Sequence, residues 1–124
     1  MAEQKSAEGL IQAVQALFHN PNPEVQRAAD TWLDDFQYSQ EAWQVCDSLL
    51  HTATVDLEVH TFCAQTMKKK AVRDFEELPP GSGAGLRDSI LTLILKLQDR
   101  GPAVRTQLCL AVVALCAHME PSEW

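Results

Sequence analysis

The most informative segment of the chain is LCLAVVALCA, which covers Leu108 to Ala117. Its ten consecutive apolar residues are too few to cross a hydrocarbon layer, which requires about 20 residues of helix, so we expect no membrane insertion. A helix that is apolar on every side belongs to the interior of a larger helical array. The segment therefore predicts an array in which other helices cover this one.

The preceding sequence has the same helical character. Apolar residues recur roughly every 3.6 residues, and no stretch alternates apolar and polar residues as a half-buried strand would. The first helix is expected at about Ala7 to His19, and the second begins at Pro23 after Asn22, a natural N-cap residue. On their apolar stripes, Phe18 and Ala28 are expected to face the core.

Four further helices follow a short joint at Ser39-Gln40. The third ends before a loop at residues 51–55, and the fourth is expected to extend from about Asp56 to Leu78. Residues 79–85, PPGSGAG, hold three of the five glycines and are expected to form a loop. The fifth helix continues through Leu97, and Gly101-Pro102 then separates it from the sixth.

Six helices in three antiparallel pairs repeat after roughly forty residues, the period of HEAT and armadillo solenoids. We therefore predict an all-α fold, an α-solenoid of three HEAT-type helical hairpins at about 7–39, 40–78 and 84–119, within one domain covering residues 1–124. In such a stack each hairpin covers the apolar face of its neighbour. The uncovered sixth helix leads us to expect that the chain is the amino-terminal end of a longer solenoid.

The charge of the chain is uneven. It contains 17 acidic and 10 basic residues, a net charge of −7. Residues 24–58 carry eight acidic residues against Arg27 alone. This field repels nucleic-acid phosphates and attracts basic partners, so we expect no direct contact with nucleic acid.

The sequence gives no support to catalysis, a metal site or a cofactor. The four cysteines form no C-x-x-C pair and are expected in the core. His60 and Cys63 could contact one ligand, as could Cys109 and Cys116, but neither pair has the further ligands that zinc needs. One alternative stays open, an enzyme with a cysteine nucleophile. The basic residues Lys68 to Lys70 and Arg73 suit the carboxyl end of the fourth helix better than an import signal.

Seven blocks of the sequence occur together, in this order, in one known family: AVQALFH (13–19), PNP (21–23), WLDDFQ (32–37), AWQV (42–45), CAQTMK (63–68), DFEELPP (74–80) and VRTQ (104–107). On these blocks the chain resembles the amino-terminal domain of the importin-β superfamily of nuclear transport receptors. The resemblance is greatest to the transportin-3 (transportin-SR) branch, and VRTQ is typical of its plant-like members.

The resemblance implies the first three HEAT repeats of a receptor with about twenty. In the family, this end of the arch binds the small GTPase Ran in its GTP form, and Ran binding releases cargo in the nucleus. The full-length receptors carry protein cargo past nuclear pore proteins and shuttle between cytoplasm and nucleus. The cargo of the transportin-SR branch is mainly splicing factors with arginine-serine domains.

The resemblance also implies a place for Ran, because the second helix of each hairpin faces the concave side of the family's arch. Gln65 and Lys68 lie in a block that matches the family motif and take a Ran-contact role from it. Outward positions on the second and fourth helices add five further Ran-binding candidates: Arg27, Asp30, Thr31, Asp34 and Lys69. Two alternatives stay open. These charges solvate an exposed face, or the chain is a helical scaffold for protein packing without GTPase binding.

Overall fold

A computed structural model describes residues 6–123 of the chain, and within this range the chain is helical with no strand. The six α-helices are α1 (Ala7–His19), α2 (Pro23–Tyr38), α3 (Glu41–Leu50), α4 (Leu57–Arg73), α5 (Gly83–Lys96) and α6 (Pro102–His118). The short 3-10 helices are η1 (Phe75–Glu77), η2 (Gln98–Arg100) and η3 (Pro121–Glu123). The predicted all-α class is confirmed.

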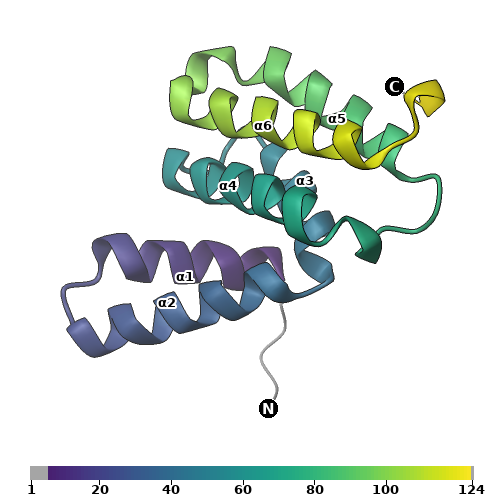
Figure 1. Ribbon diagram of the computed structural model, residues 1–124. Helices are drawn as coiled ribbons and strands as arrows, with labels where there is room; N and C mark the ends of the chain where they lie inside the picture. The colour runs from purple at the N-terminus through teal and green to yellow at the C-terminus, as the bar shows by residue number, and fades with distance from the viewer. Residues whose placement is uncertain (1–5, 124) are drawn as a thin grey trace.

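The helices pack as three antiparallel hairpins stacked in chain order (Figure 1). α1 packs on α2, α3 on α4, and α5 on α6, while α4 and α6 lie side by side. The first hairpin contacts the second less extensively than the second contacts the third. This arrangement is the HEAT-like solenoid that the forty-residue period predicts.

Local chemistry sets the predicted helix starts. The Ser6 side chain accepts a hydrogen bond of 3.1 Å from the Gly9 N–H, and the Asn22 side chain accepts one of 2.9 Å from the Glu24 N–H. These bonds satisfy amide groups that have no partner inside the helix. Gly101 has a φ of +107°, a conformation that suits glycine, and Pro102 opens α6.

Two predicted boundaries are wrong. The sequence predicts that the fourth helix reaches Leu78, but α4 ends at Arg73 and a 3-10 turn follows. Asp74 leaves helical geometry there, and its carboxylate accepts hydrogen bonds from the Lys70 and Arg73 side chains. The loop predicted at residues 79–85 is also shorter, because α5 begins at Gly83. A Cβ at Gly83 would lie 3.2 Å from the Met119 sulfur, so the glycine allows close packing.

The core runs through all three hairpins, and α4 is at its centre. Its Val59, Cys63, Ala64, Met67 and Ala71 have no exposed surface. Three residues that were predicted to be buried in the core are exposed. Phe18 is 59% exposed, and Ala28 and Cys109 are also exposed, because no described helix packs over them.

The outer side of α6 is apolar and uncovered by the described residues. Val104, Leu108, Ala111 and Leu115 are buried, whereas Leu110 and Val113 are exposed. Leu91 and Leu95 of α5 are exposed as well. Neither α6 nor any other helix in the described range is long and apolar enough to cross a membrane.

Candidate functional site

A groove of about 490 Å³ lies between the first hairpin and α4. Its lining residues come from the end of α1 (Leu17, Phe18), from α2 (Asp30, Leu33, Asp34, Gln37) and from α4 (Leu57, Glu58, Thr61, Phe62, Gln65, Lys69). Figure 1 shows the first hairpin beside α4. α2 and α4 run in the same direction. Gln37 near the end of α2 contacts Thr66 in the second half of α4, and His19, at the end of α1 that leads into α2, contacts Glu58 in the first turn of α4.

The floor of the groove is apolar. Leu33 is buried, and Leu17 and Phe62 are half-buried against the core. Phe18 and Leu57 lie at the amino-terminal end of α4 and are 59% and 47% exposed. Large apolar side chains that remain open to water beside a hollow are typical of interaction sites.

The polar residues give the groove two different ends. Asp30 and Asp34 are exposed along α2, and no hydrogen bond or ion pair within residues 6–123 engages their carboxylates. Glu58 Oε2 lies 2.7 Å from His19 Nε2. At the far end, Lys69 Nζ donates a hydrogen bond of 3.4 Å to Gln37 Oε1. Negative charge therefore dominates everywhere except at Lys69.

The groove brings together four of the seven predicted site residues: Asp30, Asp34, Gln65 and Lys69. The other three lie outside its lining. Arg27 and Thr31 are exposed elsewhere on α2, and Lys68 is half-buried on α4.

Several lining residues were not predicted from the sequence, including Gln37, Glu58 and Thr61. The spacing of the lining residues along the sequence indicates that they share a helix face. Lining residues recur every three or four positions along α2 and along α4, which places each set on one helix face. The spacing alone does not show that the two faces oppose one another.

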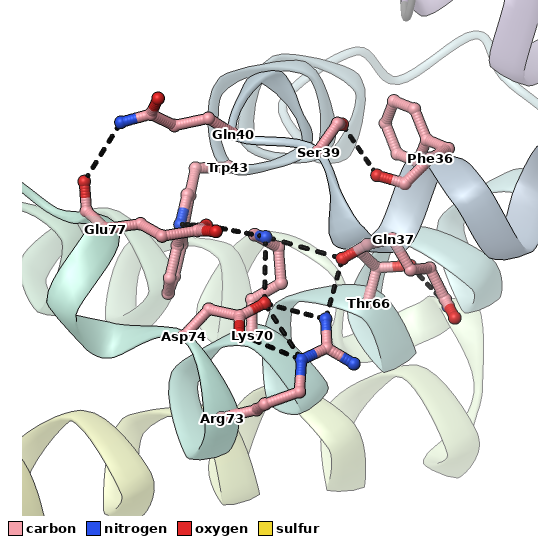
Figure 2. A network of polar contacts seen from close by, with 10 residues as sticks. All are labelled: Phe36, Gln37, Ser39, Gln40, Trp43, Thr66, Lys70, Arg73, Asp74 and Glu77. Carbon is pink, nitrogen blue, oxygen red and sulfur yellow. Dashed lines mark hydrogen bonds and ion pairs between the residues drawn. The ribbon is translucent and has the colours of Figure 1, made fainter.

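Lys70 forms a buried polar network beside the groove (Figure 2). Its ammonium group is fully buried and lies 2.8 Å from Glu77 Oε1 and 3.1 Å from Asp74 Oδ2. It also lies 5.6 Å from the centre of the Trp43 ring. The sequence places Lys70 in the basic cluster at the carboxyl end of α4, where the structure has it. Its burial was not predicted, because its partners Glu77 and Trp43 lie outside α4.

Two cations of this network cap α2 from another helix. Lys70 Nζ donates a hydrogen bond of 3.4 Å to the Gln37 carbonyl, and Arg73 Nη2 donates one of 2.8 Å to the same oxygen. The last carbonyls of a helix lack partners within it and favour cations, and α2 has no basic residue in its last turn. Hydrogen bonds from Arg73 lower the pKa of the Asp74 carboxyl, and those from Lys70 add to this effect.

Gln37 belongs to both the groove and the Lys70 network. Its carbonyl is part of the network, while its side-chain Nε2 donates a hydrogen bond of 2.9 Å to Thr66 Oγ1. Its Oε1 accepts the bond from Lys69 at the far end of the groove. One residue therefore connects the groove with the contact between the first two hairpins.

His60 has a structural role. Its Nε2 lies 3.1 Å and 3.0 Å from the carbonyl oxygens of Leu49 and Thr52, and Arg100 Nε donates a hydrogen bond of 3.1 Å to its Nδ1. Burial is the main cause that lowers the pKa of the His60 imidazole. The neutral ring with its proton on Nε2 fits these partners.

Residues 6–123 contain no group of three or more His, Cys, Asp and Glu side chains that could hold a metal ion. Of the cysteines, Cys46 and Cys63 are buried. Burial raises the pKa of the Cys46 thiol well above its usual value, and a thiol kept protonated is a poor nucleophile.

Comparison with known proteins gives a consistent result. Residues 29–96 match the family described as importin-beta N-terminal domain. The chain is 47% identical over 113 residues to Transportin MOS14 of Arabidopsis thaliana, across 91% of this chain and 12% of that protein. It is 29% identical over 119 residues to Importin-13 of Homo sapiens, across 96% of this chain and 12% of that protein. The chain thus spans about an eighth of these relatives.

Proposed function

Because this chain belongs to the importin-β family, whose members are transport receptors and not enzymes, we propose that its groove binds the small GTPase Ran in the GTP form. One observation supports the proposal above all. Asp30 and Asp34 of α2 and Gln65 and Lys69 of α4 line one groove, formed by the second helices of two consecutive hairpins. The acidic surface of this groove suits a basic partner.

We further propose that the hairpins are HEAT repeats one to three, at about 7–39, 40–78 and 84–119, of a receptor from the transportin-3 branch. The identity of 47% to a protein named Transportin MOS14, against 29% to Importin-13, supports a transportin branch. The whole receptor would carry splicing factors with arginine-serine domains and shuttle between cytoplasm and nucleus. Ran-GTP in the first repeats would favour a curvature that binds cargo weakly, which is a linkage between two ligands.

A titration of the purified 124-residue chain with Ran tests the proposal. Isothermal calorimetry with Ran loaded with a non-hydrolysable GTP analogue, and with Ran loaded with GDP, compares the two nucleotide states. We expect tighter binding of the GTP form. Equal affinity for both forms, or no binding of either, would remove the Ran assignment.

A second function has one specific observation in its favour. The exposed side chains of Leu91, Leu95, Leu110 and Val113 form an apolar surface on the outer side of the third hairpin, and such surfaces pair with other proteins. The alternative is therefore a helical scaffold that packs on another protein without GTPase binding. Self-association in light scattering, together with no response to Ran, would favour the scaffold.

A further inference from the structure

We propose that the groove recognises a protein segment in which one large apolar side chain stands beside Lys or Arg side chains. Under the proposed function this segment is part of the GTPase surface, so the inference rests on that function. Beyond that function, the groove selects particular chemical features of the partner through particular residues of this chain.

The floor of the groove offers an apolar contact to a partner. Leu33 and Phe62 form a base that is continuous with the core, and Phe18 and Leu57 stand exposed at one end of it. A side chain from a partner that covered these residues would remove apolar surface from water on both proteins. An apolar anchor seated in a pocket and surrounded by polar contacts is the arrangement that dominates binding energy in protein interfaces.

The α2 side of the groove carries negative charge. The carboxylates of Asp30 and Asp34 are exposed beside this floor and form no ion pair with a cation among residues 6–123. Glu58 adds a third carboxylate, close to the exposed end of the floor. Basic side chains next to the apolar anchor would complement these charges and steer association.

Lys69 sets the direction in which the segment lies. Among the described residues it is the only Lys or Arg in the groove lining, at the end where Gln37 holds its ammonium group. A basic side chain placed there would meet a like charge, whereas the Leu57 end offers Glu58. The basic residues of the partner are therefore expected along Asp30, Asp34 and Glu58.

Two sets of variants test the two features separately, in calorimetry with GTP-loaded Ran. Phe18→Ser removes an exposed apolar contact, and its control Leu95→Ser removes an exposed leucine far from the groove. D30N/D34N removes two groove charges, and its control Asp35→Asn removes an exposed charge of α2 outside the lining. Circular dichroism checks that each variant keeps its helical content.

We expect F18S to weaken binding about tenfold at every salt concentration. D30N/D34N is expected to weaken binding at low salt and to have little effect near 1 M salt, where the Debye length falls to about 3 Å. Both controls should bind as the wild type does. Wild-type affinity of F18S and D30N/D34N, with GTP-dependent binding intact, would overturn the inference and leave the proposed function standing.

A second measurement addresses the groove without Ran. Methyl NMR spectra of the chain are recorded with the blocked peptide Lys-Phe-Leu-Arg and with its counterpart Glu-Phe-Leu-Glu. We expect the basic peptide alone to shift the methyl signals of Leu33 and Leu57. If it does so while Ran does not bind, the groove chemistry holds and the proposed function fails. Equal shifts with both peptides, or none, would overturn the inference.

Discussion

Replacement of Lys70 by alanine is expected to lower the free energy of unfolding by about 3 kcal/mol. Removing one partner of a buried ion pair costs about 3–5 kcal/mol, because the remaining charge stays in a place where water solvates it poorly. Two features favour the lower end of this range of free energies. The side chains of Asp74 and Glu77 are 16% and 32% exposed. In addition, Arg73 continues to hold both Asp74 and the Gln37 carbonyl.

A comparison of Lys70→Ala with Lys70→Met separates the lost charge from the lost volume. Methionine fills most of the space but still leaves the carboxylates without their ammonium partner, so we expect K70M to lose about 2–3 kcal/mol, and the difference from K70A measures the cavity. Urea unfolding followed by circular dichroism at neutral pH measures both values. Lys68→Met is the control, because Lys68 is half-buried two positions away on the same helix and lies outside the network.

The network should also control the motion of the first hairpin. Since Lys70 and Arg73 hold the last turn of α2 through the Gln37 carbonyl, K70A is expected to accelerate amide hydrogen exchange in that turn more than in α6. A loss for K70A no larger than that for K68M, or unchanged exchange at the end of α2, would refute the reasoning about the buried lysine.

Three other predictions follow from local features. The pKa of the His60 imidazole is lowered from 6.5 in the fold, so the unfolded chain takes up the proton first as the pH falls. The free energy of unfolding should therefore lose the His60 contribution below pH 6.5 and keep it above that pH. Urea unfolding between pH 8 and pH 5 measures this loss, and His60→Gln should remove it. Asn22→Ala removes the hydrogen bond to the Glu24 amide and should cost about 1 kcal/mol in the same assay; no loss would contradict the capping role. L110S/V113S changes two exposed residues and should reduce self-association in light scattering while stability stays within about 0.5 kcal/mol; unchanged association would exclude this face as the contact.

The parts of the fold that depend on neighbouring residues were predictable from the sequence. Asn22 and Pro23 begin α2, and Gly101 and Pro102 begin α6, as predicted. In both places the backbone conformation and the cap are determined within a few residues. The pairing of helices followed from the forty-residue repeat.

The parts that depend on distant residues were not predictable. α4 ends at Arg73, where Asp74 is held by two cations and the chain turns toward Glu77. The burial of Lys70 depends on Trp43 and Gln37, which belong to other helices. Helical periodicity describes one helix at a time and contains no information about such partners.

The candidate site was likewise predictable only in part from the sequence. The outward faces of α2 and α4 were predicted, and their residues Asp30, Asp34, Gln65 and Lys69 do lie in one groove. That these faces oppose one another depends on the packing of the first hairpin against α4. The exposure of Phe18 at the groove depends on it too, since an amphipathic pattern assigns every apolar residue to the core.

The capping of α2 by side chains of α4 has a consequence for biosynthesis. Lys70 lies 33 residues after Gln37 in the sequence, so the ribosome makes the first hairpin well before the cations that terminate its second helix. At about 5–20 residues per second, this interval lasts roughly 2–7 seconds. During that time the nascent hairpin has an unfinished end, and its stable folding awaits synthesis of the next repeat.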